Sequence, residues 1–75
     1  MKQIDECLNR FFDNKSQLNR KWQVLGDDNI LVLFHYQHTI LIYDIVLNEI
    51  LFKWYECPTD KRGLDAALEY LDNRK

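Results

Sequence analysis

The sequence is poor in the residues from which small active sites are often built. It contains two glycines, one proline, two cysteines and one serine among 75 residues. A phosphate-binding loop needs glycines whose backbone approaches the phosphate closely, so that class of site is nearly excluded. No CxxC, HxH or HExxH pattern supplies the ligand spacing of a zinc site. The sequence therefore predicts a protein that is not an enzyme and that holds neither a metal nor another cofactor.

The sequence also lacks the signals of export, membrane insertion and polyanion binding. Charged residues interrupt every apolar segment in residues 1–15, and the run of low charge at 29–43 is shorter than the roughly 20 residues of a membrane helix. Twelve acidic and ten basic residues give a net charge of −2, which exerts no general attraction on nucleic acid or anionic membranes. We therefore expect a cytoplasmic protein with reduced thiols at Cys7 and Cys57 and no membrane partner.

What the sequence does contain is typical of a small folded domain. Apolar residues make up 47% of the chain and ten residues are aromatic, which argues against disorder. We interpret residues 1–75 as a single small α+β domain. A chain of this size buries only about 60% of its unfolded surface, so self-association would add needed stability. The abundance of Asn, Lys and Ile in so short a chain suggests a bacterial or phage origin.

Two amphipathic helices are predicted, one at each end of the chain. Ile4, Leu8 and Phe11 repeat at helical spacing and indicate a helix over about residues 2–14. Leucines and an alanine at the same spacing indicate a second helix that ends near residue 72. Thr59 or Asp60 is the expected N-cap of this helix, unless it begins at Gly63.

Between the helices the pattern changes to that of an antiparallel meander. Segments 21–25, 29–36, 39–45 and 49–56 are rich in β-branched and aromatic residues and predict strands, the first of them less clearly than the others. The "GDDN" stretch predicts a turn, and Asn48 is expected to take a positive φ in the last hairpin. The fold class is therefore α+β, with an N-terminal helix, a three- to four-stranded antiparallel meander and a C-terminal helix.

The strands have apolar residues on both faces. With residues 46–48 as a three-residue loop and Ile45 opposite Glu49, strict alternation defines two sets. The set predicted to face the core is Ile40, Ile42, Asp44, Ile50, Phe52 and Trp54. The set predicted to face a partner is Leu41, Tyr43, Ile45, Leu51, Lys53 and Tyr55.

Two short helices cannot cover both faces of such a sheet completely. Because helices in small α+β folds tend to lie on one side, we expect both to pack on one face and leave the other for a partner. The sequence thus predicts a small protein that binds another protein sterically through an apolar, aromatic sheet face, and that forms a homodimer. An adaptor, an immunity-type protein and a phage-encoded inhibitor or regulator of a host protein fit this prediction equally.

The segment "LFHYQHTILIYD", residues 33–44, contains both histidines. His35 and His38 could supply two metal ligands or a catalytic base, but no third ligand or oriented nucleophile accompanies them. A Cys57–histidine pair is the one nucleophile–base combination available. We interpret both histidines as residues of a hairpin bend, and we expect Asp44 to accept hydrogen bonds from backbone amides of a nearby turn.

Nucleic-acid binding is the alternative function. The order of helix, strands and helix, with Lys61 and Arg62 opening the last helix, resembles the double-stranded RNA-binding domain, a module that contacts phosphates and the minor groove. The sequence departs from that family in lacking its run of lysines there and in having a fourth strand candidate. A regulator of this kind would use a local basic patch made of Lys15, Arg20, Lys21, Lys61 and Arg62.

Overall fold

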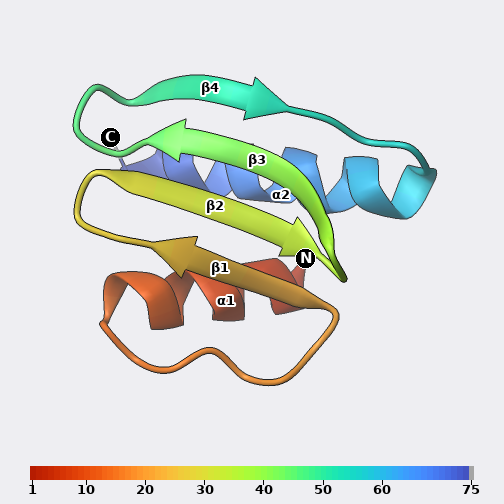
Figure 1. The fold of residues 1–75 in the computed structure, drawn as a ribbon, viewed down its shortest axis with the longest axis horizontal. Helices are drawn as coiled ribbons and strands as arrows, with labels where there is room; N and C mark the ends of the chain where they lie inside the picture. The colour runs from red at the N-terminus through yellow and green to blue at the C-terminus, as the bar shows by residue number, and fades with distance from the viewer. Residues whose placement is uncertain (75) are drawn as a thin grey trace.

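The computed structural model describes residues 1–74 and has the predicted element order of helix, four strands and helix (Figure 1). The elements are α1 (Lys2–Phe12), β1 (Trp22–Gly26), β2 (Ile30–His35), β3 (His38–Asp44), β4 (Glu49–Lys53) and α2 (Pro58–Arg74). The strands form an antiparallel sheet in the order β1-β2-β3-β4. The predicted α+β class is confirmed, including the uncertain first strand.

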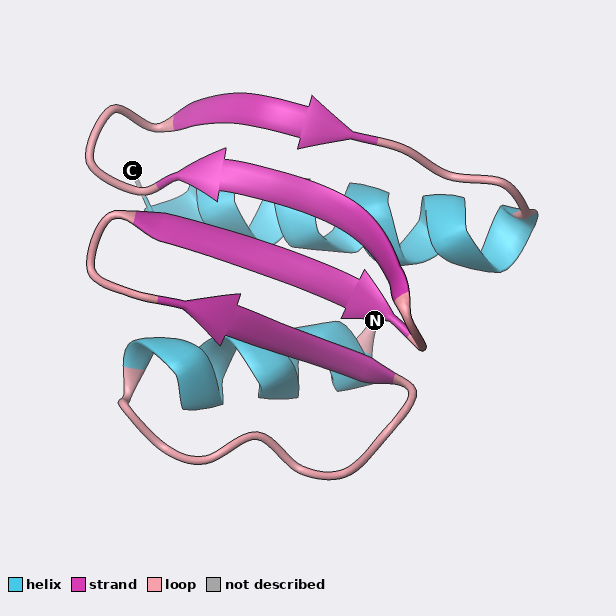
Figure 2. Cartoon of the chain, in the orientation of Figure 1, coloured by secondary structure: helices cyan, strands magenta, loops and turns pink. Residues whose placement is uncertain are grey.

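Both helices lie on the same face of the sheet, as the sequence predicted (Figure 2). The apolar faces of α1 and α2 meet the inward side chains of β1, β2 and β3, and this layer is the hydrophobic core. Its members are Ile4, Cys7, Leu8, Trp22, Val24, Leu31, Leu33, Ile40, Leu41, Tyr43, Leu64, Ala67 and Leu71.

The end of α1 and the start of α2 are each marked by a residue suited to that position. α1 stops because Asn14 takes a left-handed conformation, φ 58°, and the N–H groups of Asn14 and Lys15 bond back to Phe11 and Arg10. This is a Schellman arrangement with asparagine in the position usually held by glycine. α2 begins at Pro58, which suits the first helical position because proline has no N–H to leave unpaired. The predicted N-cap at Thr59 or Asp60 is therefore two or three residues late, and the alternative start at Gly63 is five residues late.

Two β-bulges change which side chains reach the core. Leu33 lies opposite Leu41 and Phe34 opposite Thr39, so Ile40 is an extra residue in β3. Ile42 lies opposite Phe52 and Tyr43 opposite Ile50, so Leu51 is an extra residue in β4. Because each bulge shifts the alternation by one residue, the prediction that Ile42, Asp44 and Phe52 face the core is wrong.

The last hairpin also differs from its prediction in length. Asp44, and not Ile45, lies opposite Glu49, so the connection has four residues. Asn48 has the predicted positive φ, 56°. The carboxylate of Asp44 accepts the Leu47 N–H at 2.9 Å, which confirms the turn-capping role expected for it.

Candidate functional site

One face of the sheet carries no helix among the described residues, and we call it the open face (Figure 1). Leu25 lies opposite Val32, Val32 opposite Ile42, and Ile42 opposite Phe52. Opposite residues of antiparallel strands project from the same side, so these four side chains form an apolar row across the whole sheet. The ends of the row are well exposed, Leu25 at 51% and Phe52 at 43%. Its neighbours on the same face are Gln23, Ile30, Phe34, Thr39, Asp44 and Glu49.

Acidic residues gather at one end of the open face. Asp44 and Glu49 lie directly opposite each other on β3 and β4. Asp27 and Asp28 lie at the same end, in the turn between β1 and β2. The pKa of Asp27 is below its ordinary value because the N–H groups of Ile30 and Asn29 donate to its carboxylate. The open face therefore joins an apolar row to a concentration of negative charge.

The Asp44–Glu49 pair costs the isolated protein stability, because like charges directly opposite each other repel. Glu49→Gln is expected to raise the free energy of unfolding by about 0.2–1 kcal/mol at low ionic strength, and by less in high salt. Urea denaturation at two salt concentrations measures this. Glu69→Gln on the exposed side of α2 is the matched control, and an equal gain there would show that the effect comes from net charge and not from this pair.

Leu41 and Tyr43, predicted to face a partner, are buried beneath the helices instead, at 0% and 4% exposure. Their assignment to an exposed face is wrong, because the bulge at Ile40 turns Leu41 and Tyr43 toward α2. Ile45 packs against the edge of the core. These three residues are not part of the open face.

The other three residues of that predicted set are exposed but lie elsewhere. Leu51 is the bulged residue of β4 and is 54% exposed. Lys53 and Tyr55 line a hollow of about 430 Å³ between the end of β4 and α2. A second hollow of about 490 Å³ lies farther along α2, beside Ile50. The helix layer therefore leaves the inner side of β4 largely uncovered, and a binding role for Leu51, Lys53 and Tyr55 stays a prediction.

The predicted basic patch is weakened by ion pairs. Arg20 contacts the Glu6 carboxylate at 3.0 Å, and Lys61 contacts that of Asp65 at 2.8 Å. The pKa of Lys61 is raised by its hydrogen bond to Asp65 and by the charge of that residue. Lys15, Lys21 and Arg62 are exposed. Two of the five charges are thus partly neutralised, and a nucleic-acid-binding role for this patch stays a prediction.

His35 belongs to a buried polar cluster that joins the sheet to α2. Its Nδ1–H donates to Asp60 at 2.5 Å, and its ring stacks on Trp22 with centroids 4.1 Å apart. The Asp60 carboxylate also accepts the N–H groups of Glu56 and Cys57, at 3.1 and 3.4 Å. Burial raises the pKa of Asp60, but the hydrogen bonds from His35, Glu56 and Cys57 outweigh it and lower the pKa to about 2. An ionised Asp60 only accepts hydrogen bonds, so the proton lies on Nδ1 of His35.

The other histidine and the two cysteines lie apart from one another. His38 lies opposite His35 but is exposed, and its ring lies 5.6 Å from that of Trp54. The Cys57 backbone N–H donates to Asp60, and among the described residues no hydrogen bond joins Cys57 to either histidine. The thiol of Cys7 donates to the Trp22 carbonyl, and burial followed by the charge of Glu6 raises its pKa, which disfavours the reactive thiolate.

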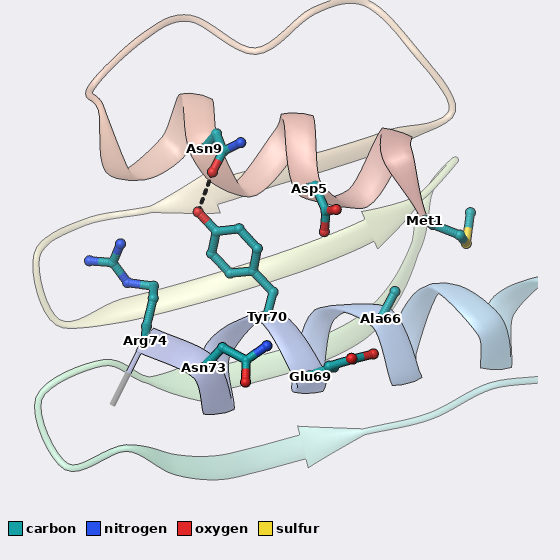
Figure 3. Close-up of a pocket in the computed structure, with 8 residues that line it drawn as sticks. All are labelled: Met1, Asp5, Asn9, Ala66, Glu69, Tyr70, Asn73 and Arg74. Carbon is teal, nitrogen blue, oxygen red and sulfur yellow. Dashed lines mark hydrogen bonds between the residues drawn. The ribbon is translucent and has the colours of Figure 1, made fainter.

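A further hollow, of about 480 Å³, lies between α1 and α2 (Figure 3). Figure 3 shows Tyr70 crossing it, where its hydroxyl donates to the Asn9 side chain. Phe12 stacks on Tyr70, and Arg74 lies over the Phe12 ring at 3.6 Å. These contacts hold the helices together, and every buried side-chain nitrogen or oxygen in residues 1–74 has a partner. This hollow is a groove between the two helices, spanned by the contact between Tyr70 and Asn9.

Within residues 1–74, no three His, Cys, Asp or Glu side chains are grouped so as to hold a metal ion. The two helices of the described chain are too short or too polar to cross a membrane. Comparison with protein-family models, with curated proteins and with solved structures gave no match. The site is therefore argued from its own geometry.

Strict alternation of side chains along the strands did not predict which residues form the open face, although it applies correctly to β2. Ile30, Val32 and Phe34 alternate with the buried residues of β2 and so share one side of the strand, as simple alternation would place them. The row continues onto β3 and β4 only when both bulges are known, because they bring Ile42 and Phe52 to that side. Neither bulge contains a glycine, the residue that often marks a bulge in a sequence.

Proposed function

We propose that this protein is a non-enzymatic binding module that covers an apolar surface of another protein with its open face. The observation that carries the proposal is the row Leu25–Val32–Ile42–Phe52, which crosses all four strands on a face that no helix covers. An antiparallel sheet with one wet face normally alternates apolar and polar residues, and this one does not. Contiguous exposed apolar surface is typical of interaction sites.

The charge pattern supports a partner that is apolar in the middle and basic at one edge. A lysine or arginine of the partner placed between Asp44 and Glu49 would relieve their repulsion. The pair would therefore strengthen binding, although it destabilises the unbound protein. The Asp27–Asp28 turn extends the same negative region. Charge of this kind contributes to orientation and association rate, while the apolar row supplies most of the affinity.

The mode of action would be steric. A flat sheet face has no enclosed pocket for chemistry, and it acts by occupying or bridging a surface of its partner. Adaptors, immunity-type proteins and phage-encoded inhibitors of host proteins all work in this way. The proposal includes a bacterial or phage source and a cytoplasmic location, which rest on composition and agree with free thiols at Cys7 and Cys57.

The test compares two leucine-to-glutamate variants. Leu25→Glu places a charge on the open face, whereas Leu47→Glu places one in the β3–β4 turn, where the leucine is 64% exposed. A protein captured by the wild type from its own cells is identified, purified and titrated calorimetrically against all three forms. We expect Leu25→Glu to weaken binding about tenfold or more, as for loss of an interface anchor, and Leu47→Glu, which adds charge at the acidic end, not to weaken it.

Asp44→Asn tests the charge component separately. Asparagine keeps an oxygen to accept the Leu47 N–H, so the turn is preserved while the charge is removed. A basic partner should bind this variant more weakly and with less dependence on salt. Unchanged binding by Leu25→Glu, or equal losses in Leu25→Glu and Leu47→Glu, would refute the open face as the binding surface.

A further inference from the structure

Exposed aromatic rings gather at one end of the molecule. The β2–β3 turn, the start of β1, the end of β4 and the start of α2 all lie at this end (Figure 1). Tyr36 in the turn is 61% exposed, and Trp54 and Tyr55, which follow β4, are 37% and 49% exposed. The ring of His38, at the other side of the turn, lies 5.6 Å from that of Trp54. We call Tyr36, Trp54 and Tyr55 the ring cluster; none of the three belongs to the core.

Positively charged side chains border the ring cluster. Lys21 adjoins the β2–β3 turn, because its carbonyl accepts the Tyr36 N–H at 2.7 Å. Lys53 is the last residue of β4, and Arg62 lies near the start of α2. These three cations are exposed and make no ion pair within residues 1–74. Glu56 is the single acidic residue between β4 and α2, so the positive charge at this end is largely uncompensated.

The acidic residues of the open face lie at the opposite end of the sheet. Asp27, Asp28, Asp44 and Glu49 are in or beside the β1–β2 and β3–β4 turns. β2 connects the two ends with six residues, a length of about 20 Å at about 3.3 Å per residue. This exceeds the Debye length of about 8 Å at physiological ionic strength. The net charge of −2 therefore does not prevent the ring cluster from attracting an anion.

A hollow of about 430 Å³ opens beside the ring cluster. Trp54 and Tyr55 line it from the side of β4, and Lys61 lines it from α2 together with two leucines. The ammonium group of Lys61 lies 5.7 Å from the centre of the Tyr55 ring and bonds to Asp65. An aromatic base joined to a phosphate fits such a lining, because the base stacks on the rings while the phosphate meets a lysine.

We propose that this end of the molecule binds single-stranded nucleic acid. Unpaired bases stack on the ring cluster, and phosphates contact the three cations that border it. A single strand is favoured because the bases of a duplex already stack on one another and leave no face free for a protein ring. Lys53 lies opposite the buried Leu41 and so projects from the helix side of the sheet. The site is therefore separate from the open face and does not depend on the function proposed for it.

The width of the site favours a strand over a mononucleotide. The start of β1, which carries Lys21, and the end of β4, which carries Lys53, lie at opposite edges of the sheet. Neighbouring strands are about 4.8 Å apart, so these edges are separated by roughly 14 Å. Stacked nucleotides rise about 3.4 Å each, so several phosphates of a strand would pass over this end.

Loss of one ring tests the stacking. A fluorescein-labelled thymidine strand of about 12 nucleotides, within the usual range of such sites, is titrated with the protein, and fluorescence anisotropy gives the Kd. Tyr36→Asn removes a ring, and asparagine tolerates the positive φ of 56° at this position. This variant is expected to bind about tenfold more weakly, as for loss of one stacked base. Phe52→Leu removes an exposed ring from the open face instead and is the matched control, which should bind as the wild type does.

The salt dependence of the Kd tests the charges. Each phosphate contact to a single strand contributes about 0.7 to the slope of log Kd against log salt concentration. The double variant Lys53→Gln/Arg62→Gln should therefore lower this slope by about 1.4. Lys15→Gln, just beyond the end of α1 at the opposite end of the molecule, should leave the slope unchanged.

Several results would overturn the proposal. Absence of binding at low salt does so, and so does a duplex or a base-free polyphosphate that binds as tightly as the strand, because the rings would then contribute nothing. Thymidine monophosphate binding as tightly as the strand would restrict the site to one nucleotide, and tighter binding of polyglutamate would make the ligand an acidic protein. Tyr36→Asn should still bind the protein partner of the open face, and Leu25→Glu should still bind the strand, so either proposal can fail without the other.

Discussion

Asp60→Ala is expected to lower the free energy of unfolding by about 3–5 kcal/mol, because three hydrogen-bond donors lose their shared acceptor and an unsatisfied buried donor costs about 1–3 kcal/mol. The carboxylate is 4% exposed, and it is the shared acceptor for the His35 ring and for two backbone N–H groups at the start of α2. Alanine has no side-chain oxygen, so all three donors lose their acceptor. A domain of 75 residues has roughly 4–11 kcal/mol of stability in all, so this single change should leave the protein close to unfolding.

Equilibrium urea denaturation measures the effect, and Asp60→Asn is the matched variant. The amide oxygen still accepts hydrogen bonds, so asparagine should cost less than alanine while losing the charge. If alanine costs less than about 1 kcal/mol, the net value of an ordinary hydrogen bond, the cluster does not hold α2 to the sheet.

The same residue predicts a dependence of stability on pH. The pKa of Asp60 is lowered from 3.8 to about 2 in the folded protein. A carboxyl whose pKa is depressed by folding stabilises the folded state above its unfolded pKa, and this contribution is lost as the pH falls through the folded pKa. The stability gap between wild type and Asp60→Asn should therefore be constant above about pH 5 and shrink between about pH 4 and pH 2. A gap that is unchanged at pH 2 would contradict the low pKa.

Trp22→Ala is expected to cost about 3–5 kcal/mol, as for the loss of a large aromatic side chain from a core. Trp22 is 2% exposed and lies in β1, yet its ring reaches α2 and stacks on His35. Removing it would leave a cavity between β1, β2 and α2. Denaturation of this variant by urea gives the value, and Trp54 remains as the fluorescent reporter of unfolding.

Gly63 explains how the Trp22 ring fits against α2. A Cβ at this position would lie 2.0 Å from the indole, a distance that no side-chain contact allows. Gly63→Ala should therefore destabilise the protein, although alanine normally favours a helix by about 1 kcal/mol over glycine. In a Trp22→Leu background the same change should cost much less, because the smaller side chain leaves room. Equal costs in both backgrounds would show that the ring does not determine the need for glycine.

Much of the fold could be predicted from the sequence because its local signals agree with one another. Helical spacing placed both ends of α1 and the C-terminal end of α2 to within about two residues. The start of α2 was predicted too late. The β-branched runs placed all four strands, and the tendency of helices in small α+β folds to lie on one side correctly predicted that both helices share one face.

The candidate site was predicted less well, because side-chain direction in a strand depends on unbroken alternation. Two bulges, at Ile40 and Leu51, reversed the faces of β3 and part of β4. The bulge at Ile40 lets both Ile40 and Leu41 be buried, which depends on tertiary packing that is not visible in a single sequence. The bulge at Leu51 lies on an exposed strand, and no residue there marks it in the sequence.

The hydrogen bond of His35 was also beyond prediction from local sequence. Its place in a hairpin bend was predicted, but its partner Asp60 lies 25 residues away and was assigned only to a helix cap. Local spacing reveals helix caps and turns, whereas a pairing between the sheet and a distant helix depends on how the layers pack. In the fold, His35 donates to Asp60 and so joins the sheet to α2.

The central claim, that the open face is the interaction surface, is tested most directly by methyl NMR of the protein with its purified partner. The account predicts that the methyl signals of Leu25, Val32 and Ile42 shift or broaden on binding, while those of Ile4, Leu8 and Leu71 in the core do not. Changes confined to side chains lining the two hollows beside α2, such as Ile50 and Leu68, would contradict it and place the partner between β4 and the helix.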